Sequence, residues 1–391
     1  MLVARSGRVL SLGAEPDIAI PPGCETIDLG DTALLPGFVN AHTHLELTGL
    51  RGQVATGPFF NWVRAVKQLK DGLSDEDYRT ASRRGVLENF AAGVTTIGDT
   101  GSSMAPARAM AALGARGIAY HEVFGPHPDQ CRASMDALAI SLLELDGLAS
   151  ERLAVGVSPH APYTVSEPLL EEVIQLAYEE DRPLAMHLAE SPEEWQLLTQ
   201  CAGAFADMFL ARGIPLPESH ETPAEFAVSL MMPELRSLLI HCVHVTEDDL
   251  WLMSEHGAAV AHCPWSNKAL GVGAMPLSAM LAQGIPVGLG TDSVVPGRGI
   301  DMFEEMRSAL YVTPLPAERV LSLATLEAAQ ALGVADAGLI APGSWADLCA
   351  VDLARMPEGD DPVEWLVANA TAYDVTRTWI AGSVVYERHD A

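Results

Sequence analysis

Short apolar segments that alternate with helical segments constrain the fold of this chain more than any other feature. One apolar run typical of a buried strand lies at Leu34–Val39, and seven more follow it: VTTIGD, GIAYHEVF, RLAVGVSPH, PLAMHLAE, SLLIHCVHV, AAVAHCPW and PVGLGTDS. Helical periodicity fills most of the gaps, at 75–92, 104–115, 133–148, 167–180, 247–256 and 301–311. Eight strands that alternate with helices predict an α/β chain folded as a (β/α)8 TIM-like barrel.

The two ends of the chain have a different pattern from the middle. Residues 1–35 and 342–391 contain short alternating runs separated by Gly and Pro turns, which predicts a few short strands at each end. We expect these ends to pair as one small β-sandwich-like domain, because chain termini are often close in space. Residues 36–341 would then form the barrel. The segment near 192–235 is too long for one crossover helix, so it predicts a helical insertion and a candidate lid.

The acidic composition excludes two classes of partner. The 391 residues include 52 acidic and 23 basic side chains, and the formal net charge is -29. Such a chain repels phosphate backbones and anionic lipids. We therefore expect a small-molecule substrate, with neither a nucleic acid nor a membrane as partner. For the oligomeric state, the expectation that we carry forward is a homodimer.

Cysteine usage and the amino-terminal sequence predict a cytoplasmic protein. The six cysteines are scattered and form no C-x-x-C pair, which indicates buried reduced thiols rather than a disulfide framework. The first residues lack the apolar core of a signal peptide. No apolar run approaches the length of about 18 residues that a membrane span needs.

Polar residues gather where the predicted strands end. In a barrel these ends lie on one face, which is where active sites are built. Each histidine taken alone also fits an ordinary core or surface position, but so many at strand ends predict a functional site. The residues are His42, His44, Asp99, Glu122, His160, His187, His241, His262 and Asp292.

Four of these residues are candidate metal ligands, namely His42, His44, His187 and Asp292. Because side chains alternate along a strand, His42 and His44 leave the same face. Three imidazoles and one carboxylate suit Zn²⁺ or Fe²⁺, and we take zinc as the first expectation. None of the three lysines lies on the fourth strand, where two-metal barrel hydrolases commonly carry a carboxylated lysine. The sequence therefore predicts one divalent ion.

Three residues are candidates for moving protons near that ion. Asp292 could accept a proton from water, and Glu190 could pass one to a ring nitrogen and then to a leaving group. The alternative for Glu190 is a solvated loop carboxylate. His241 would hydrogen-bond the attacking water, whereas His244 lies past its strand end and could be structural. The serine-hydrolase elbow G-x-S-x-G and the P-C-x-x-C deaminase signature are absent.

Five motifs along the chain resemble those of the amidohydrolase superfamily, in the same order and over nearly the whole sequence. They are PGFVNAHTH, HLAES, HCVHV, GTDS and APGSWADLCAVDL. Within it the chain is most similar to the deaminase and chlorohydrolase branch. The longer segments HTHLELTGLRG, PFFNWV, SPHAPYTVS and HLAESPEEW look closest to the aminodeoxyfutalosine deaminases of menaquinone synthesis. Two features depart from the family. The loop VVPGRGID contains Arg298, which either changes what the pocket admits or faces solvent. The amino terminus is short, which predicts that the first strand of the β-domain is missing or trimmed.

The resemblance implies one zinc or iron ion on the four ligands and proton transfer by Glu190 and His241. It implies that His160 contacts the substrate and that Trp62 or Phe59 either stacks on a purine or packs in the core. Glu122 and His244 are further candidates for substrate contact. We expect hydrolytic deamination of an aminopurine nucleoside-like substrate. The alternatives are ring-amide or imide hydrolysis, dechlorination, and a non-catalytic barrel scaffold.

Overall fold

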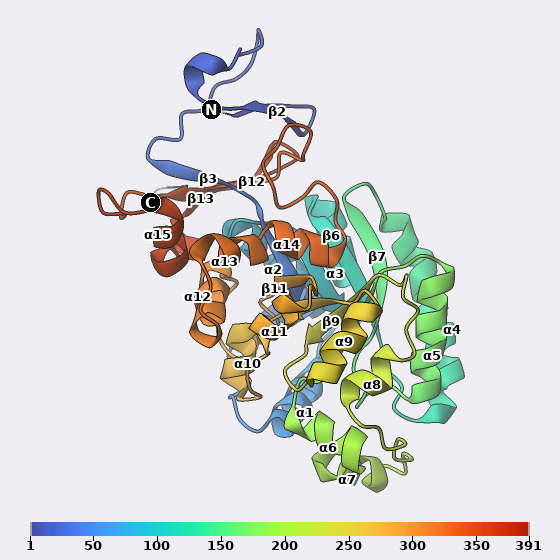
Figure 1. Cartoon of the computed structure of the whole chain (residues 1–391). Coiled ribbons are helices and arrows are strands. Elements are labelled where there is room, and N and C mark those ends of the chain that lie inside the picture. The colour runs from blue at the N-terminus through green and yellow to red at the C-terminus, as the bar shows by residue number, and fades with distance from the viewer. Residues whose placement is uncertain (1, 390–391) are drawn as a thin grey trace.

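Eight parallel strands form a barrel whose strand order follows the sequence, which confirms the predicted fold class. The computed structural model describes residues 2–389 (Figure 1). Each barrel strand pairs with the next one along the chain. The strands are β4 (Phe38–Thr43), β5 (Val94–Gly101), β6 (Arg116–Val123), β7 (Leu153–Pro159), β8 (Leu184–Leu188), β9 (Ser237–His241), β10 (Ala259–His262) and β11 (Val287–Leu289).

Helices cover the outside of the barrel, and all six predicted helical segments are confirmed. They are α2 (Asp75–Ala91), α3 (Ala105–Leu113), α4 (Cys131–Leu145), α5 (Glu167–Glu179), α9 (Glu247–Glu255) and α12 (Met302–Val312). Local sequence explains where two of them begin. Ser74 caps α2 and Thr246 caps α9, each in a reciprocal pair with the aspartate three residues later. The remaining helices after β10 are α10 (Pro264–Leu270), α11 (Leu277–Ala282), α13 (Ala317–Leu323), α14 (Leu326–Leu332) and α15 (Pro362–Asn369).

The first and last strands meet next to the predicted ligands. The Asp292 N–H donates to the carbonyl of His42 at 3.0 Å, and Thr43 pairs with Asp292 in a parallel bridge. Gly290 permits this approach, since a Cβ there would lie 2.8 Å from the backbone nitrogen of His42. The closure of the barrel therefore sets the distance between two of the candidate ligands.

Strands from both chain ends form a separate antiparallel sheet, as predicted. Its order is β14 (Ser383–Glu387), β13 (Val375–Ile380), β12 (Leu348–Asp352) and β3 (Thr32–Pro36). A hairpin of β1 (Leu2–Arg5) and β2 (Arg8–Leu12) lies beside it, and Val9 packs with Leu348 and Trp379 in one apolar cluster. Short 3-10 turns lie at Glu15–Asp17, Leu45–Leu50 (η2), Pro128–Gln130, Asp146–Leu148 and Ala372–Asp374.

The prediction of one strand over Leu34–Val39 is wrong. The run contains the end of β3, in the flanking sheet, and the start of β4, in the barrel. The chain crosses between them at Gly37, where a Cβ would lie 2.2 Å from the Thr95 side chain. Because apolar side chains occupy both strands, the sequence pattern continues across the break and does not reveal it.

The predicted insertion is helical. It contains α6 (Pro192–Gln200), α7 (Gly203–Ala211) and α8 (Pro223–Val228). An apolar cluster joins α6 and α7 to α1 (Phe59–Lys70), and Figure 1 shows these three helices at the end of the barrel opposite the flanking sheet. Within residues 2–389, no helix has both the length and the apolar character needed to cross a membrane.

The expectation of buried cysteines holds for half of them. Cys242, Cys263 and Cys349 are buried, Cys131 and Cys201 are half-buried, and all six cysteines are free thiols. Cys24 is exposed, so burial was wrong for that residue. It lies in the loop between β2 and β3, where no apolar core surrounds it.

Candidate active site

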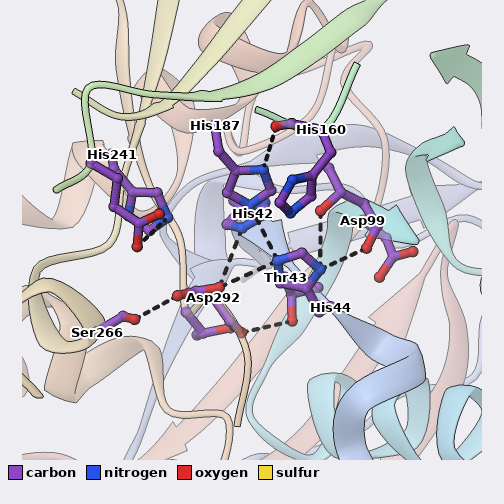
Figure 2. Close-up of polar contacts among 12 residues, drawn as sticks. His42, Thr43, His44, Asp99, His160, His187, His241, Ser266 and Asp292 are labelled. Atoms are coloured by element: carbon purple, nitrogen blue, oxygen red, sulfur yellow. Dashed lines mark hydrogen bonds and ion pairs between the residues drawn. The ribbon is translucent and has the colours of Figure 1, made fainter. Parts of the chain in front are cut away.

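The structure brings the four candidate metal ligands together at the carboxyl ends of the strands (Figure 2). His42 lies in β4, and His44 follows it at the start of η2. His187 lies in β8, and Asp292 follows β11. Their exposed fractions range from 0% to 9%, so none of them is an ordinary surface residue.

Three of the distances between donor atoms are short enough for the side chains to share one ion. The Asp292 Oδ1 atom lies 3.4 Å from His42 Nε2 and 3.5 Å from His44 Nε2. His44 Nε2 lies 3.3 Å from His187 Nε2. Zinc holds nitrogen and oxygen ligands at about 2.0–2.1 Å, which places tetrahedral ligand atoms about 3.3–3.4 Å apart. Neither ring nitrogen of His42 has a hydrogen-bond partner in the described chain, as expected for a side chain that awaits a ligand.

Backbone carbonyls orient two of the imidazoles. His44 Nδ1 donates to the carbonyl of Thr100 at 2.9 Å, and His187 Nδ1 donates to the carbonyl of His160 at 3.0 Å. Both rings therefore present the unprotonated Nε2 to the centre. Burial, together with the neighbouring His42, lowers the pKa of His44 to about 3, and burial also holds the pKa of His187 well below its ordinary value. Neutral imidazole is the form that binds a metal.

The candidate proton-transfer residues lie beside the ligands. Glu190 Oε1 is 3.5 Å from His241 Nε2. Glu190 is only 4% exposed, so the alternative of a solvated loop carboxylate does not fit. Burial, followed by the nearby Asp292 and Glu194 carboxylates, raises the pKa of Glu190 well above its usual range. This environment favours the protonated form of Glu190 relative to an exposed glutamate.

Asp292 has the opposite electrostatic environment. Burial alone would raise its pKa, but the adjacent His42 ring and the neighbouring His241 hold the pKa of Asp292 well below the usual range. Its backbone adopts φ +55°, and that of His241 adopts φ +73°, both in the left-handed region that costs non-glycine residues energy. The environments of Asp292 and Glu190 therefore shift the pKa values of these two carboxyl groups in opposite directions.

The candidate substrate residues fall into two groups. Glu122 Oε1 is buried without a hydrogen-bond partner, 3.9 Å from His44 Nδ1 and 4.0 Å from His160 Nε2. These residues therefore lie at the edge of the ligand group. Trp62 and Phe59 instead lie in the apolar cluster of α1, α6 and α7, which favours packing over stacking on a substrate.

Other predicted residues lie outside the ligand group. His244 Nε2 donates to the carbonyl of Val272 at 2.8 Å, which indicates a structural role. Asp99 accepts the Leu45 N–H at 2.7 Å, so it shapes the turn after His44. His262 is fully buried, and neither of its ring nitrogens has a hydrogen-bond partner in the described chain.

Arg298 does not simply face solvent, and its effect on what the pocket admits stays a prediction. It is largely buried, stacks over the Trp265 ring at 4.6 Å and pairs with Glu305 at 2.7 Å. The Arg298 side chain is therefore only 17% exposed, and its charge is already paired with a carboxylate.

Sequence reasoning missed several polar residues that hold the site in place. Ser266 donates to Asp292 Oδ2, and Asn267 Oδ1 lies 2.8 Å from His241 Nδ1. Glu194 accepts the N–H groups of Ala189 and Glu190 at 2.8 and 2.9 Å. The pattern S-x-x-E at 191–194 is a helix-start signal that could have identified Glu194. Ser266 and Asn267 carry no such signal, because they lie on α10, far along the chain from the residues they contact.

Comparisons with known proteins agree with this site and fold. The model of the amidohydrolase family matches residues 33–385. A 5-methylthioadenosine/S-adenosylhomocysteine deaminase of Nitratidesulfovibrio vulgaris (strain DSM 19637 / Miyazaki F) is 34% identical over 400 residues, which cover 99% of this chain and 87% of that protein.

Among solved structures, an adenosine deaminase from Xanthomonas campestris with bound zinc superimposes on this chain with a TM-score of 0.85 at 27% sequence identity. The match covers 98% of this chain and 87% of the chain of that deaminase. The aminofutalosine deaminase of Helicobacter pylori has a TM-score of 0.83 at 22% identity, covering 98% of this chain and 94% of its own, which shows the fold alone. Since the family model and the first relative both extend over nearly the whole sequence, the chain belongs to the amidohydrolase family of hydrolytic enzymes that act on carbon–nitrogen bonds.

Proposed function

We propose that the protein is a hydrolytic deaminase that releases ammonia from an aminopurine nucleoside-like substrate and uses one divalent ion, zinc in the first place and iron as the alternative. The observation that carries the proposal is the buried group of His42, His44, His187 and Asp292, in which three distances between donor atoms are 3.3–3.5 Å, with the buried Glu190 beside it. The relatives named as deaminases support the reaction class.

His42, His44, His187 and Asp292 would hold the ion. A divalent ion in this donor set lowers the pKa of a water molecule toward neutrality and so supplies a nucleophile. Asp292, as a carboxylate beside the water, would accept the proton that the water loses. His241 lies where its Nε2 can hydrogen-bond the same water.

Glu190 supplies the second proton. It donates to the ring nitrogen next to the amino-bearing carbon while the water oxygen bonds to that carbon. The proton on Asp292 then moves to the amino group, the carbon–nitrogen bond breaks, and ammonia leaves. As the new carbonyl forms, the hydroxyl proton returns to Glu190, so both carboxyl groups regain their starting states.

Two residues at the edge of the ligand group are the proposed substrate contacts. Glu122 offers an unpartnered acceptor oxygen, and His160 presents Nε2 beside it. For the substrate, adenosine, 5-methylthioadenosine and S-adenosylhomocysteine come first, because relatives and a structural neighbour are named for them. Aminodeoxyfutalosine, and with it a place in menaquinone synthesis, comes second. The cytoplasmic location and the homodimer stay predictions.

The test is ammonia release by zinc-loaded protein from a panel of these four nucleosides. Glu190→Gln should lower turnover by about 10²–10⁴-fold, since general acid catalysis supplies about that factor, and should retain zinc. Glu171→Gln, an exposed glutamate on α5, is the matched control and should behave as the wild type. Ammonia from none of the nucleosides, with turnover of imides, lactams or chlorotriazines instead, would overturn the proposal.

A further inference from the structure

The first turn of α10 contacts two site residues that come from different strands. Ser266 and Asn267 are adjacent in sequence, and their exposed fractions are 0% and 1%. Ser266 contacts Asp292, which follows β11, and Asn267 contacts His241, at the end of β9. α10 follows β10, which lies between those two strands in the barrel. One short helix therefore bridges the two groups that handle the water proton in the proposed reaction.

The contact to His241 decides which of its ring nitrogens carries the proton. Asn267 Oδ1 lies 2.8 Å from His241 Nδ1, and an amide oxygen can only accept. The proton of the neutral imidazole therefore lies on Nδ1. The other nitrogen, Nε2, then faces Glu190 Oε1 at 3.5 Å and the rings of His42 and His187 as an acceptor.

The hydrogen bond from Ser266 gives the two carboxylate oxygens of Asp292 different partners. Oδ1 lies 3.4–3.5 Å from the Nε2 atoms of His42 and His44, whereas Oδ2 accepts the Ser266 hydroxyl. Rotation of the carboxylate about its Cβ–Cγ bond would break the hydrogen bond to Ser266. The hydroxyl thus keeps Oδ1 directed at the histidines.

The backbone at both contacted residues is strained, so orientation by side-chain contacts matters here. His241 has φ +73° and Asp292 has φ +55°, both in the left-handed region that residues with a side chain rarely adopt. Such conformations persist only where the surroundings hold them. The hydrogen bonds from α10 are two of those restraints.

We propose that Ser266 and Asn267 are positioning residues: Asn267 holds His241 in the Nδ1-protonated form, and Ser266 directs Asp292 Oδ1 at the metal-binding histidines. This inference rests on the proposed function, because it assigns the two residues to the proton-transfer step. It also makes claims about tautomer and metal affinity that do not depend on turnover.

The first test compares two substitutions of Asn267 that differ in one property. Asn267→Asp keeps the acceptor oxygen, whereas Asn267→Leu has a similar size without an acceptor. We expect Asn267→Leu to lower kcat by about 10–100-fold with KM nearly unchanged. Losing the hydrogen-bond partner that orients a histidine of a metal site typically costs about that factor. Asn267→Asp should recover most of that loss. Lys268→Gln, an exposed neighbour on α10, is the control and should leave both constants unchanged.

A second test reads the tautomer directly. In NMR spectra of wild-type protein labelled with ¹⁵N-histidine, the ring of His241 should carry its proton on Nδ1. It should lose this preference in Asn267→Leu. The His241 signals are assigned by their absence in the His241→Gln variant. Ser266→Ala should weaken zinc affinity by about 10–100-fold in chelator competition, while the melting temperature of the metal-free protein stays close to the wild type.

The outcomes separate this inference from the proposed function. A wild type that releases no ammonia from any nucleoside refutes the proposed deaminase function. The measurements of the His241 tautomer and of zinc affinity still test the positioning role, because they do not require turnover. A proton on Nε2 in the wild type, or an Asn267→Asp variant as impaired as Asn267→Leu, overturns the role of Asn267. Unchanged zinc affinity in Ser266→Ala overturns the role of Ser266.

Discussion

A buried ion pair joins the barrel to the flanking sheet, and breaking it should strongly destabilise the protein. Arg116 begins β6, and Asp347 precedes β12. Their side chains pair through Arg116 Nε, and their exposed fractions are 2% and 1%. Asp347 also accepts the Ala381 N–H at 2.7 Å. The Arg116 guanidinium lies 4.2 Å from the centroid of the Trp345 ring, and the Arg8 guanidinium lies 3.9 Å from it.

The expected magnitude follows from this burial. Arg116→Met fills the space of the side-chain stem but leaves the Asp347 carboxylate buried with one hydrogen bond. Removing one partner of a buried pair costs about 3–5 kcal/mol, because the remaining charge is uncompensated. Arg116→Met with Asp347→Asn removes both charges and keeps an acceptor for Ala381. The double variant should therefore be more stable than Arg116→Met alone, with a coupling energy of about 2 kcal/mol or more.

The assay is equilibrium urea denaturation of the four proteins in the cycle at matched zinc concentration. Arg132→Met is the control, because its pair with Asp136 is exposed and should contribute nothing measurable. A loss of less than about 1 kcal/mol in Arg116→Met, or a double variant as unstable as the sum of the singles, would refute this reasoning about the buried pair.

Three further predictions concern the site and the charge of the whole chain. Gly290→Ala should weaken zinc affinity, because the new Cβ would lie 2.8 Å from the backbone nitrogen of His42. Gly299→Ala is the control and should leave zinc affinity unchanged, because a Cβ at Gly299 would meet no atom within 4 Å. Removing the metal with a chelator should lower the melting temperature, and added zinc should restore it, since a ligand that binds the folded state stabilises it; a melting temperature independent of zinc would contradict the site. Raising the salt concentration should raise the melting temperature, because screening reduces self-repulsion at a net charge of -29; a flat response would show that the surface charges are already balanced locally.

The barrel and its ligand group could be predicted because they depend on patterns that repeat along the chain. Parallel strands joined by helices bring all their carboxyl ends to one face. Once β4, β8 and β11 were recognised, His42, His187 and Asp292 had to lie on that face. The identity of the residues then selected a metal site, since three imidazoles and a carboxylate have few other uses when buried together.

Contacts between strands distant in sequence were not visible in the pattern. The break at Gly37 between two sheets depends on the Thr95 side chain, which lies far along the chain. Trp62 matched a family motif, but only the packing of α1 on α6 and α7 showed an apolar environment for it.

The sequence by itself determined the fold class, the face that carries the site and the four candidate donor residues, because strand periodicity and residue chemistry are local properties. Only the tertiary structure decided how the donors are oriented and how the environments of Glu190 and Asp292 differ. The orientation of the donors depends on groups from other elements: Thr100 for His44, Asn267 for His241, and Ser266 for Asp292. Hydrogen bonds and burial act over a few ångströms in space, and no spacing along the chain records them.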